Sequence, residues 1–188
     1  MYEGRTAPAY LTAIILFSAG IAVGIVALLA NPDLGKTLME TLRNSIMGDI
    51  AGETPPVVFV KILANNLQAC LLLFLGGASL GVLTAFIISS NGVIIGAVIE
   101  IVREREGILY VAAGVVPHGV FEIPSFIISG GLGFLLAGAL WREWNGAGDA
   151  AAEASGLGRT FLRFVVPLVT IAAFIEAFIT PEIIRLVL

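Results

Sequence analysis

The residues best suited to chemistry lie in the segment Pro117–Pro124, which reads Pro-His-Gly-Val-Phe-Glu-Ile-Pro. It contains His118, the only histidine of the chain, and Glu122, and it lies between two apolar stretches. If one helical turn survives here, residues four apart share a face and the imidazole can meet the carboxylate. Inside a membrane such a pair could relay protons or cations or bind a polar ligand, because ionisable side chains there are costly and commonly functional.

Further polar residues within apolar stretches extend this candidate site. Glu176 lies in an otherwise apolar segment and needs a hydrogen-bond donor, which His118, an asparagine or Thr170 could supply. The whole polar core, or ligand or ion site, consists of Asn65, Asn66, Asn91, His118, Glu122 and Glu176. Two interpretations stay open. These residues form a functional pocket, or they form interhelical hydrogen bonds that fix how the helices dock. Such hydrogen bonds contribute only about 0.6 kcal/mol on average, so they would specify geometry more than stability.

Catalytic and metal-binding motifs do not accompany these residues in the sequence. There is no GxSxG, HExxH, P-loop or SxxK pattern, and one histidine with one cysteine, Cys70, is too few for a structural zinc site. We therefore expect no enzymatic activity, no cofactor and no metal site. A metal held by His118, Glu122 and Glu176 is chemically conceivable and is the least favoured of our hypotheses.

Composition places these residues in a membrane. The chain is 58% hydrophobic and 13% charged, with a mean hydropathy of +1.00, whereas soluble domains carry about 25% charged residues. Several apolar runs approach or exceed the ~20 residues that cross the hydrocarbon layer. The sequence predicts a multi-pass protein of the cell membrane, in contact with the lipid bilayer. Its net charge of −4, without a basic cluster, argues against nucleic acid as a partner.

The elements that position the polar core are predicted as an all-α polytopic membrane protein. Four long transmembrane helices are expected at about 10–30, 57–89, 120–140 and 161–179. The apolar pieces 93–101 and 107–116 are too short to cross alone, so we interpret them as short or re-entrant helices, with two thin crossings as the alternative. Helix breaks are expected at Gly92, Pro117, Gly119, Pro124 and Pro181.

Residues 31–50 predict an amphipathic surface helix, because apolar side chains recur every four positions and charged ones fall on other faces. Together with the spans it would form a single transmembrane domain over 1–188. The two short pieces count as an even number of crossings, which predicts that both termini lie on one side of the membrane, outside the cell by the positive-inside rule.

Glycines four apart predict close helix packing. GxxxG pairs, in which small residues let helix backbones approach within lipid, include Gly20/Gly24, Gly77/Gly81 and Gly92/Gly96. Packing within one chain is our preferred interpretation, and self-association is the alternative. On the whole sequence we nevertheless expect a homo-oligomer, with membrane proteins as further partners.

Several polar and glycine elements, taken in chain order, resemble the stage II sporulation protein M family over about 57–182. They are Asn65-Asn66, Gly76-Gly77 with Gly81, Asn91-Gly92 with Gly96, Pro117–Pro124 and Ile175–Pro181. By matching positions, the family's signature residues would be Asn65, Asn66, Asn91, Gly92, Pro117, His118, Gly119, Glu122, Glu176 and Pro181.

The resemblance implies a role in the cell envelope. The family's named members are membrane components of the machinery that remodels septal peptidoglycan as a mother cell engulfs the forespore. There the chain would be similar to a scaffold that recruits enzymes and is not itself the hydrolase. Our first hypothesis is thus a non-enzymatic membrane scaffold. The alternative is a small-solute or cation or proton transporter or channel, because transporters place polar sites at broken helices.

Overall fold

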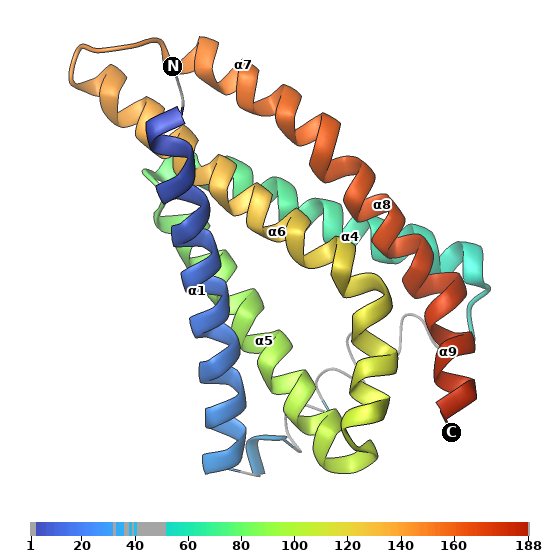
Figure 1. Ribbon diagram of the computed structural model, residues 1–188. Helices are drawn as coiled ribbons and strands as arrows, with labels where there is room; N and C mark the ends of the chain where they lie inside the picture. Colours follow the sequence, from blue (N-terminus) through green and yellow to red (C-terminus); the bar gives the residue numbers. More distant parts are fainter. Residues whose placement is uncertain (1–2, 32, 36–37, 39, 41–51, 188) are drawn as a thin grey trace.

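The computed structural model of the protein describes residues 3–31, 33–35, 38, 40 and 52–187. These residues form helices and connecting turns and contain no strand, which confirms the all-α prediction. Most of the amphipathic helix predicted for 31–50 lies outside the described residues. The α-helices whose bounds fall within the described residues are α1 (Glu3–Ala30), α4 (Pro55–Leu75), α5 (Val82–Glu106), α6 (Ile108–Trp144), α7 (Ala150–Thr160), α8 (Val166–Phe174) and α9 (Thr180–Val187) (Figure 1).

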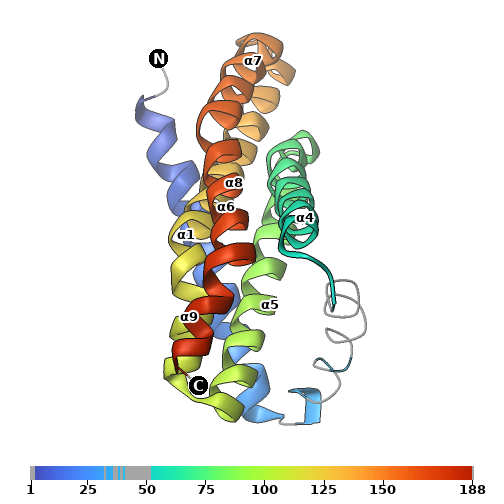
Figure 2. The ribbon, with the colours of Figure 1, turned by 90° about the vertical axis from the view of Figure 1, so that its right-hand side faces the viewer.

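Five helical stretches of the described chain are long and apolar enough to cross a membrane: Arg5–Ala30, Pro55–Ser79, Val82–Glu106, Ile108–Trp144 and Ala150–Val187. Many large apolar side chains on their outer faces are exposed, as expected for helices in lipid, among them Val26, Phe86 and Leu162. The two ends of the chain lie at opposite ends of the molecule in both views (Figures 1 and 2). Five crossings would place the termini on opposite sides of the membrane, in contrast to the even number expected from the sequence.

The chain reverses direction at Gly76–Gly81, so the single span expected over about 57–89 is divided between α4 and α5. After α4 comes a 3-10 turn, Gly76–Ser79, and then Leu80 and Gly81 adopt left-handed backbone conformations with φ of 55° and 87°. Glycine enters this conformation without steric cost, which makes Gly81 suited to the reversal. The Ser79 hydroxyl then accepts a hydrogen bond from the Leu83 amide at 2.8 Å and so satisfies a donor in the first turn of α5.

Gly92 lies inside α5 and serves packing, so the helix break predicted there is wrong. A Cβ atom on Gly92 would lie 3.1 Å from Gly20 Cα, and one on Gly20 would lie 2.5 Å from the Ser89 carbonyl oxygen. α1 and α5 therefore approach backbone to backbone, and the glycine pairs Gly20/Gly24 and Gly92/Gly96 face each other within one chain. The expected short helix 93–101 is the second half of α5, and 107–116 is almost entirely the start of α6.

The 37-residue helix α6 is the central element. It continues through Pro117, Gly119 and Pro124, so the breaks predicted at these residues are wrong. Each proline removes one backbone donor, but a membrane helix tolerates this by bending where neighbouring elements pack around it. Figure 1 shows α6 changing direction along its length. In the most apolar 18-residue segment of α6, 61% of the residues are buried, whereas the corresponding share in each of the other four stretches is 28% or less. The helix contacts α1, α4, α5, α7, α8 and α9.

The C-terminal helices form one continuous rod with two π-helical turns, Phe161–Val165 and Ile175–Ile179. Each turn ends two residues before a proline, Pro167 or Pro181. Proline cannot donate a backbone hydrogen bond and its ring collides with the carbonyl four residues earlier, so widening the preceding turn relieves both problems. The helix break predicted at Pro181 is thus a widened turn that precedes it, and the rod continues as α9.

Candidate functional site

The candidate site is formed by His118 and Glu122 of α6 and Glu176 of the π turn Ile175–Ile179. One ligand atom from each of the three side chains lies within 4.8 Å of the other two. His118 Nε2 is 3.6 Å from Glu122 Oε2, which is longer than the ~3.2 Å limit of an ordinary hydrogen bond. All three side chains are partly buried, with 13% of His118 and 18% of Glu122 exposed. The structure therefore brings together the three ionisable members of the predicted polar core.

The histidine lacks the partners that a buried imidazole normally has. Its Nδ1 atom is buried and has no hydrogen-bond partner in the described chain, and its Nε2 atom is too far from Glu122 for a good hydrogen bond. The hydroxyl of Thr180, four residues after Glu176, is likewise buried without a partner. Buried polar groups nearly always have a hydrogen-bond partner. Two unpaired polar atoms close in sequence to members of the same cluster therefore require an explanation.

The π turn brings Glu176 to this place. An α-helix with a π turn accommodates one extra residue locally, which rotates the side chains that follow relative to those before it. The turn and α9 both pack against α6. Figure 1 shows the lower part of α6 between α5 on one side and the α8–α9 rod on the other. Glu176 thus comes to His118 and Glu122 from the C-terminal rod.

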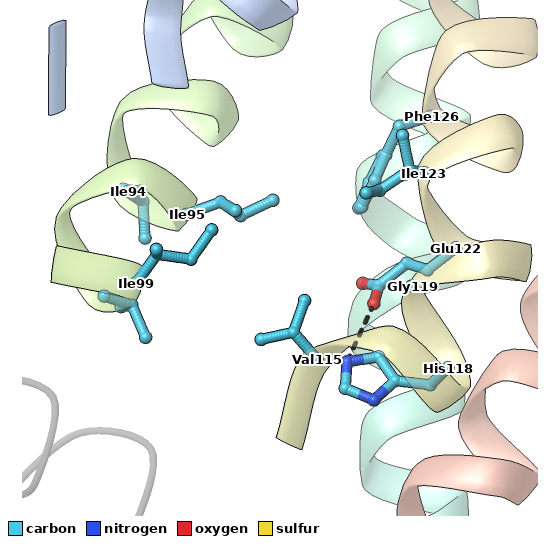
Figure 3. A pocket seen from close by; sticks show the side chains of 10 residues that line it. Ile94, Ile95, Ile99, Val115, His118, Gly119, Glu122, Ile123 and Phe126 are labelled. Carbon is cyan, nitrogen blue, oxygen red and sulfur yellow. Dashed lines mark ion pairs between the residues drawn. The ribbon is translucent and has the colours of Figure 1, made fainter. Parts of the chain in front are cut away.

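A partly open cavity of about 180 Å³ lies on the α5 side of this cluster. Ile94, Ile95 and Ile99 of α5 form one wall, and His118 and Glu122 lie in the other (Figure 3). Its lining is otherwise apolar, so the two ionisable groups are its main polar feature. Sequence reasoning missed the α5 wall, because an isoleucine that faces a cavity cannot be told from one that faces lipid in an apolar span.

A second group of buried polar atoms lies one turn further along α6. The Ser125 hydroxyl donates to the Glu122 backbone carbonyl at 2.6 Å, and the Ser129 hydroxyl donates to the Ser125 carbonyl at 2.8 Å. Cys70 Sγ of α4 lies 3.7 Å from Ser125 Oγ. All three side chains are fully buried. They stabilise the backbone of α6 beside Glu122 and join it to α4, and sequence reasoning did not identify Cys70 and Ser125 as neighbours.

The predicted asparagines bond elsewhere. The Asn65 amide donates to the Asn66 side-chain oxygen at 3.1 Å within α4, and Asn91 donates to the Ile87 carbonyl of its own helix at 2.9 Å. Thr170, considered as a donor for Glu176, donates to the Val166 carbonyl of its own helix at 2.8 Å. The candidate site is therefore the His118, Glu122 and Glu176 cluster, hereafter the His–Glu–Glu cluster, and the asparagines have separate roles.

Comparison with known proteins identifies the family. The family described as stage II sporulation protein M matches residues 13–181, which include the His–Glu–Glu cluster and begin earlier than the resemblance seen from about residue 57. An uncharacterized protein of Methanocaldococcus jannaschii is 29% identical over 176 residues, covering 90% of this chain and 92% of that protein. No solved structure matches the chain significantly. On the extent of the family match, the chain belongs to the stage II sporulation protein M family.

Proposed function

We propose that this chain is a non-enzymatic, multi-pass scaffold of the cell membrane, similar to the stage II sporulation M component of cell-envelope remodelling machinery. Family membership supports the general role. The observation that carries the proposal is a pair of polar side chains, Asn65 and Gln68, on the outward face of α4, near the middle of an apolar span. A surface that faced only lipid would not favour them there.

Gln68 lies on an otherwise apolar stripe. Val60, Ala64, Leu72 and Leu75 are exposed at helical spacing before and after it, and Gln68 itself is exposed. Moving an unpaired amide from water into a medium that cannot form hydrogen bonds costs roughly 4–8 kcal/mol. Polar side chains on membrane helices commonly reduce this cost by hydrogen bonding across a helix interface. The stripe is therefore suited to a helix–helix contact.

The occupant that this surface fits is a second copy of the chain. An amide carries both a donor and an acceptor, so two Gln68 side chains related by a two-fold axis can satisfy each other. Ala64, one turn away, is small enough to let two α4 helices approach closely. The glycine pairs of α1 and α5 are engaged within one chain and so do not offer this contact. We infer a homodimer through α4, which would present the same partner-binding surfaces twice.

The test is the oligomeric state of the purified protein in a mild detergent and in lipid nanodiscs, measured by light scattering and mass photometry. Wild type is expected to be a dimer. The variant Gln68→Leu should be a folded monomer, because it removes the amide of the stripe, keeps the stripe apolar and leaves the Asn65–Asn66 hydrogen bond in place.

Thr12→Val is the matched control. Thr12 is an exposed polar residue of α1 whose hydroxyl already donates to the Pro8 carbonyl at 2.9 Å, so this change should leave the dimer intact. A monomeric wild type, or a Gln68→Leu variant that dimerises as wild type does, would refute the inferred contact.

Transport of a cation or protons is the second candidate, and the His–Glu–Glu cluster favours it because ionisable groups within a membrane often mark ion paths. In proteoliposomes, wild type would then pass cations or protons, and Glu122→Gln and Glu176→Gln would abolish the flux while remaining monodisperse. Flux that is equal in empty vesicles, wild type and both variants would remove this candidate and leave the scaffold.

A further inference from the structure

We propose that His118, Glu122 and Glu176 together bind one divalent transition-metal ion inside the membrane domain. This site is additional to the proposed dimer contact on α4 and does not depend on it. Its basis is geometric: three side chains with metal-binding atoms converge from two separate helical segments. From the sequence, by contrast, we expected no metal site, because the chain has a single histidine.

The spacing of the atoms suits two ligands of one ion. In a tetrahedral site with bonds of about 2.05 Å, neighbouring ligand atoms lie about 3.4 Å apart. His118 Nε2 and Glu122 Oε2 are 3.6 Å apart, too long for a strong hydrogen bond and close to this ligand spacing. The largest separation in the cluster, 4.8 Å at most, would require Glu176 to move inward by no more than about 1.4 Å. A glutamate side chain can make that adjustment by rotating its own bonds.

The unsatisfied polar atoms are an independent observation. Neither nitrogen of His118 makes a hydrogen bond with the described chain, although Nδ1 is buried. A metal ion would engage Nε2, the imidazole nitrogen that faces Glu122. The other nitrogen of a metal-ligating histidine normally donates a hydrogen bond, so the buried Nδ1 is the atom from which a further partner is expected when the ion is bound. The orphan Thr180 hydroxyl lies four residues from Glu176 and is the kind of polar group that orients a ligating carboxylate.

Charge balance favours a divalent ion. Two carboxylates this close together repel each other, and water does not screen them well inside a membrane. A divalent cation neutralises both charges and leaves the imidazole uncharged as the third ligand. One nitrogen and two oxygen donors suit borderline ions such as Zn²⁺, Fe²⁺ and Mn²⁺, whereas all-oxygen sites suit Mg²⁺ and Ca²⁺. The cavity of about 180 Å³ beside the cluster leaves room for water as a further ligand.

The bound ion would join α6 to the C-terminal rod. His118 and Glu122 belong to α6, and Glu176 belongs to the π turn that packs against it. Anything that binds only the folded state stabilises it by mass action. Occupancy should therefore raise the unfolding temperature of the whole membrane domain.

The experiment titrates Co²⁺, a spectroscopic substitute for Zn²⁺, into the full-length protein after treatment with a chelator. Wild type should bind one Co²⁺ per chain, with the visible absorption of a low-symmetry site, and Zn²⁺ should displace it. Glu176→Gln and His118→Asn should each weaken binding by at least ten-fold. Zn²⁺ should raise the unfolding temperature of wild type and leave that of Glu176→Gln unchanged.

Glu182→Gln is the control, because Glu182 is an exposed carboxylate six residues after Glu176 that pairs with Arg185. It should bind Co²⁺ as wild type does. Folded wild type that binds neither ion stoichiometrically would overturn the proposal, and so would ligand variants that bind with unchanged affinity. If the variants do not fold, X-ray absorption of Zn²⁺-loaded wild type decides. Nitrogen and oxygen ligands alone support the site, and a sulfur ligand from Cys70 or the absence of a defined shell overturns it.

Discussion

Replacing Gly96 by alanine should force α1 and α5 apart. A Cβ atom at this position would lie 2.9 Å from both Cα and the carbonyl carbon of Ile21 and closer still to the Ile21 carbonyl oxygen. Ordinary contacts of a Cβ atom begin at 3.4 Å, so the contacts with the two carbon atoms alone require the helices to separate by about 0.5 Å, and the contact with the carbonyl oxygen requires more. The obstacle is backbone, which cannot rotate away as a side chain can.

The expected loss in the free energy of unfolding follows from two opposing effects of Gly96→Ala. Overpacking of this kind costs about 1–3 kcal/mol, and a rigid backbone neighbour places Gly96→Ala at the upper end. Alanine recovers about 1 kcal/mol because it favours the helix more than glycine does. The net loss should be about 2 kcal/mol, which corresponds to a fall of about 4–8 °C in unfolding temperature for a chain of this size.

Cys70 supplies the assay. It is the only cysteine of the chain and is fully buried, so a maleimide dye that fluoresces on reaction with a thiol reports opening of the core during heating. Gly158→Ala is the matched control, because a Cβ on Gly158 of α7 would meet nothing within 4 Å. That variant should be as stable as wild type or up to ~1 kcal/mol more stable. A Gly96→Ala protein that unfolds at or above the wild-type temperature would refute the close packing of α1 on α5.

Two further predictions concern topology and the turn between α4 and α5. Epitope tags fused to the two termini should be accessible from opposite sides of sealed membrane vesicles, and accessibility from one side would contradict five crossings. Thr84→Val should lower stability by about 0.6 kcal/mol, and by no more than ~1.7 kcal/mol, because it removes the bond that the fully buried Thr84 hydroxyl donates to the Leu73 carbonyl at 2.9 Å. The same thiol assay measures this change, and an unaltered unfolding temperature would show that the bond contributes nothing.

Local rules account for several features of the fold. Two prolines after Thr54 are typical of a helix start, and α4 begins at Pro55. Trp141 and Trp144 are typical of the interfacial end of a span, and α6 ends at Trp144. The spacing of His118 and Glu122 predicted that they share a helix face, and they do. These features depend on residues within one or two turns of each other, which is the range over which sequence alone carries the information.

Glycine and proline are ambiguous in the sequence because each has two uses in a membrane helix. Gly92 follows Ser-Ser-Asn and resembles a turn, yet it is needed for the approach of α1. The GxxxG pair Gly77/Gly81 predicts packing, yet the positive φ of Gly81 makes the turn. A proline inside a water-exposed helix usually ends or kinks it. In α6 the helix continues through Pro117 and Pro124, because the surrounding helices stabilise the backbone.

The third member of the site could not be located from sequence. Glu176 lies 54 residues after Glu122, and its position depends on the packing of the C-terminal rod against α6 and on the π turn before Pro181. The sequence showed only that Glu176 needed a partner, and it offered the asparagines equally. The structure distinguishes them, because Asn65 pairs with Asn66 and Asn91 bonds to its own helix.

The most direct test of the proposed scaffold is disulfide crosslinking in native membranes. In a Cys70→Ala background, Leu72→Cys places a single thiol on the α4 stripe one turn from Gln68, and Val26→Cys places one on an exposed face of α1. Self-association through α4 predicts a crosslinked dimer for Leu72→Cys, its loss when Gln68→Leu is added, and no crosslink at Val26→Cys. No dimer at Leu72→Cys, or equal crosslinking at both positions, would contradict it.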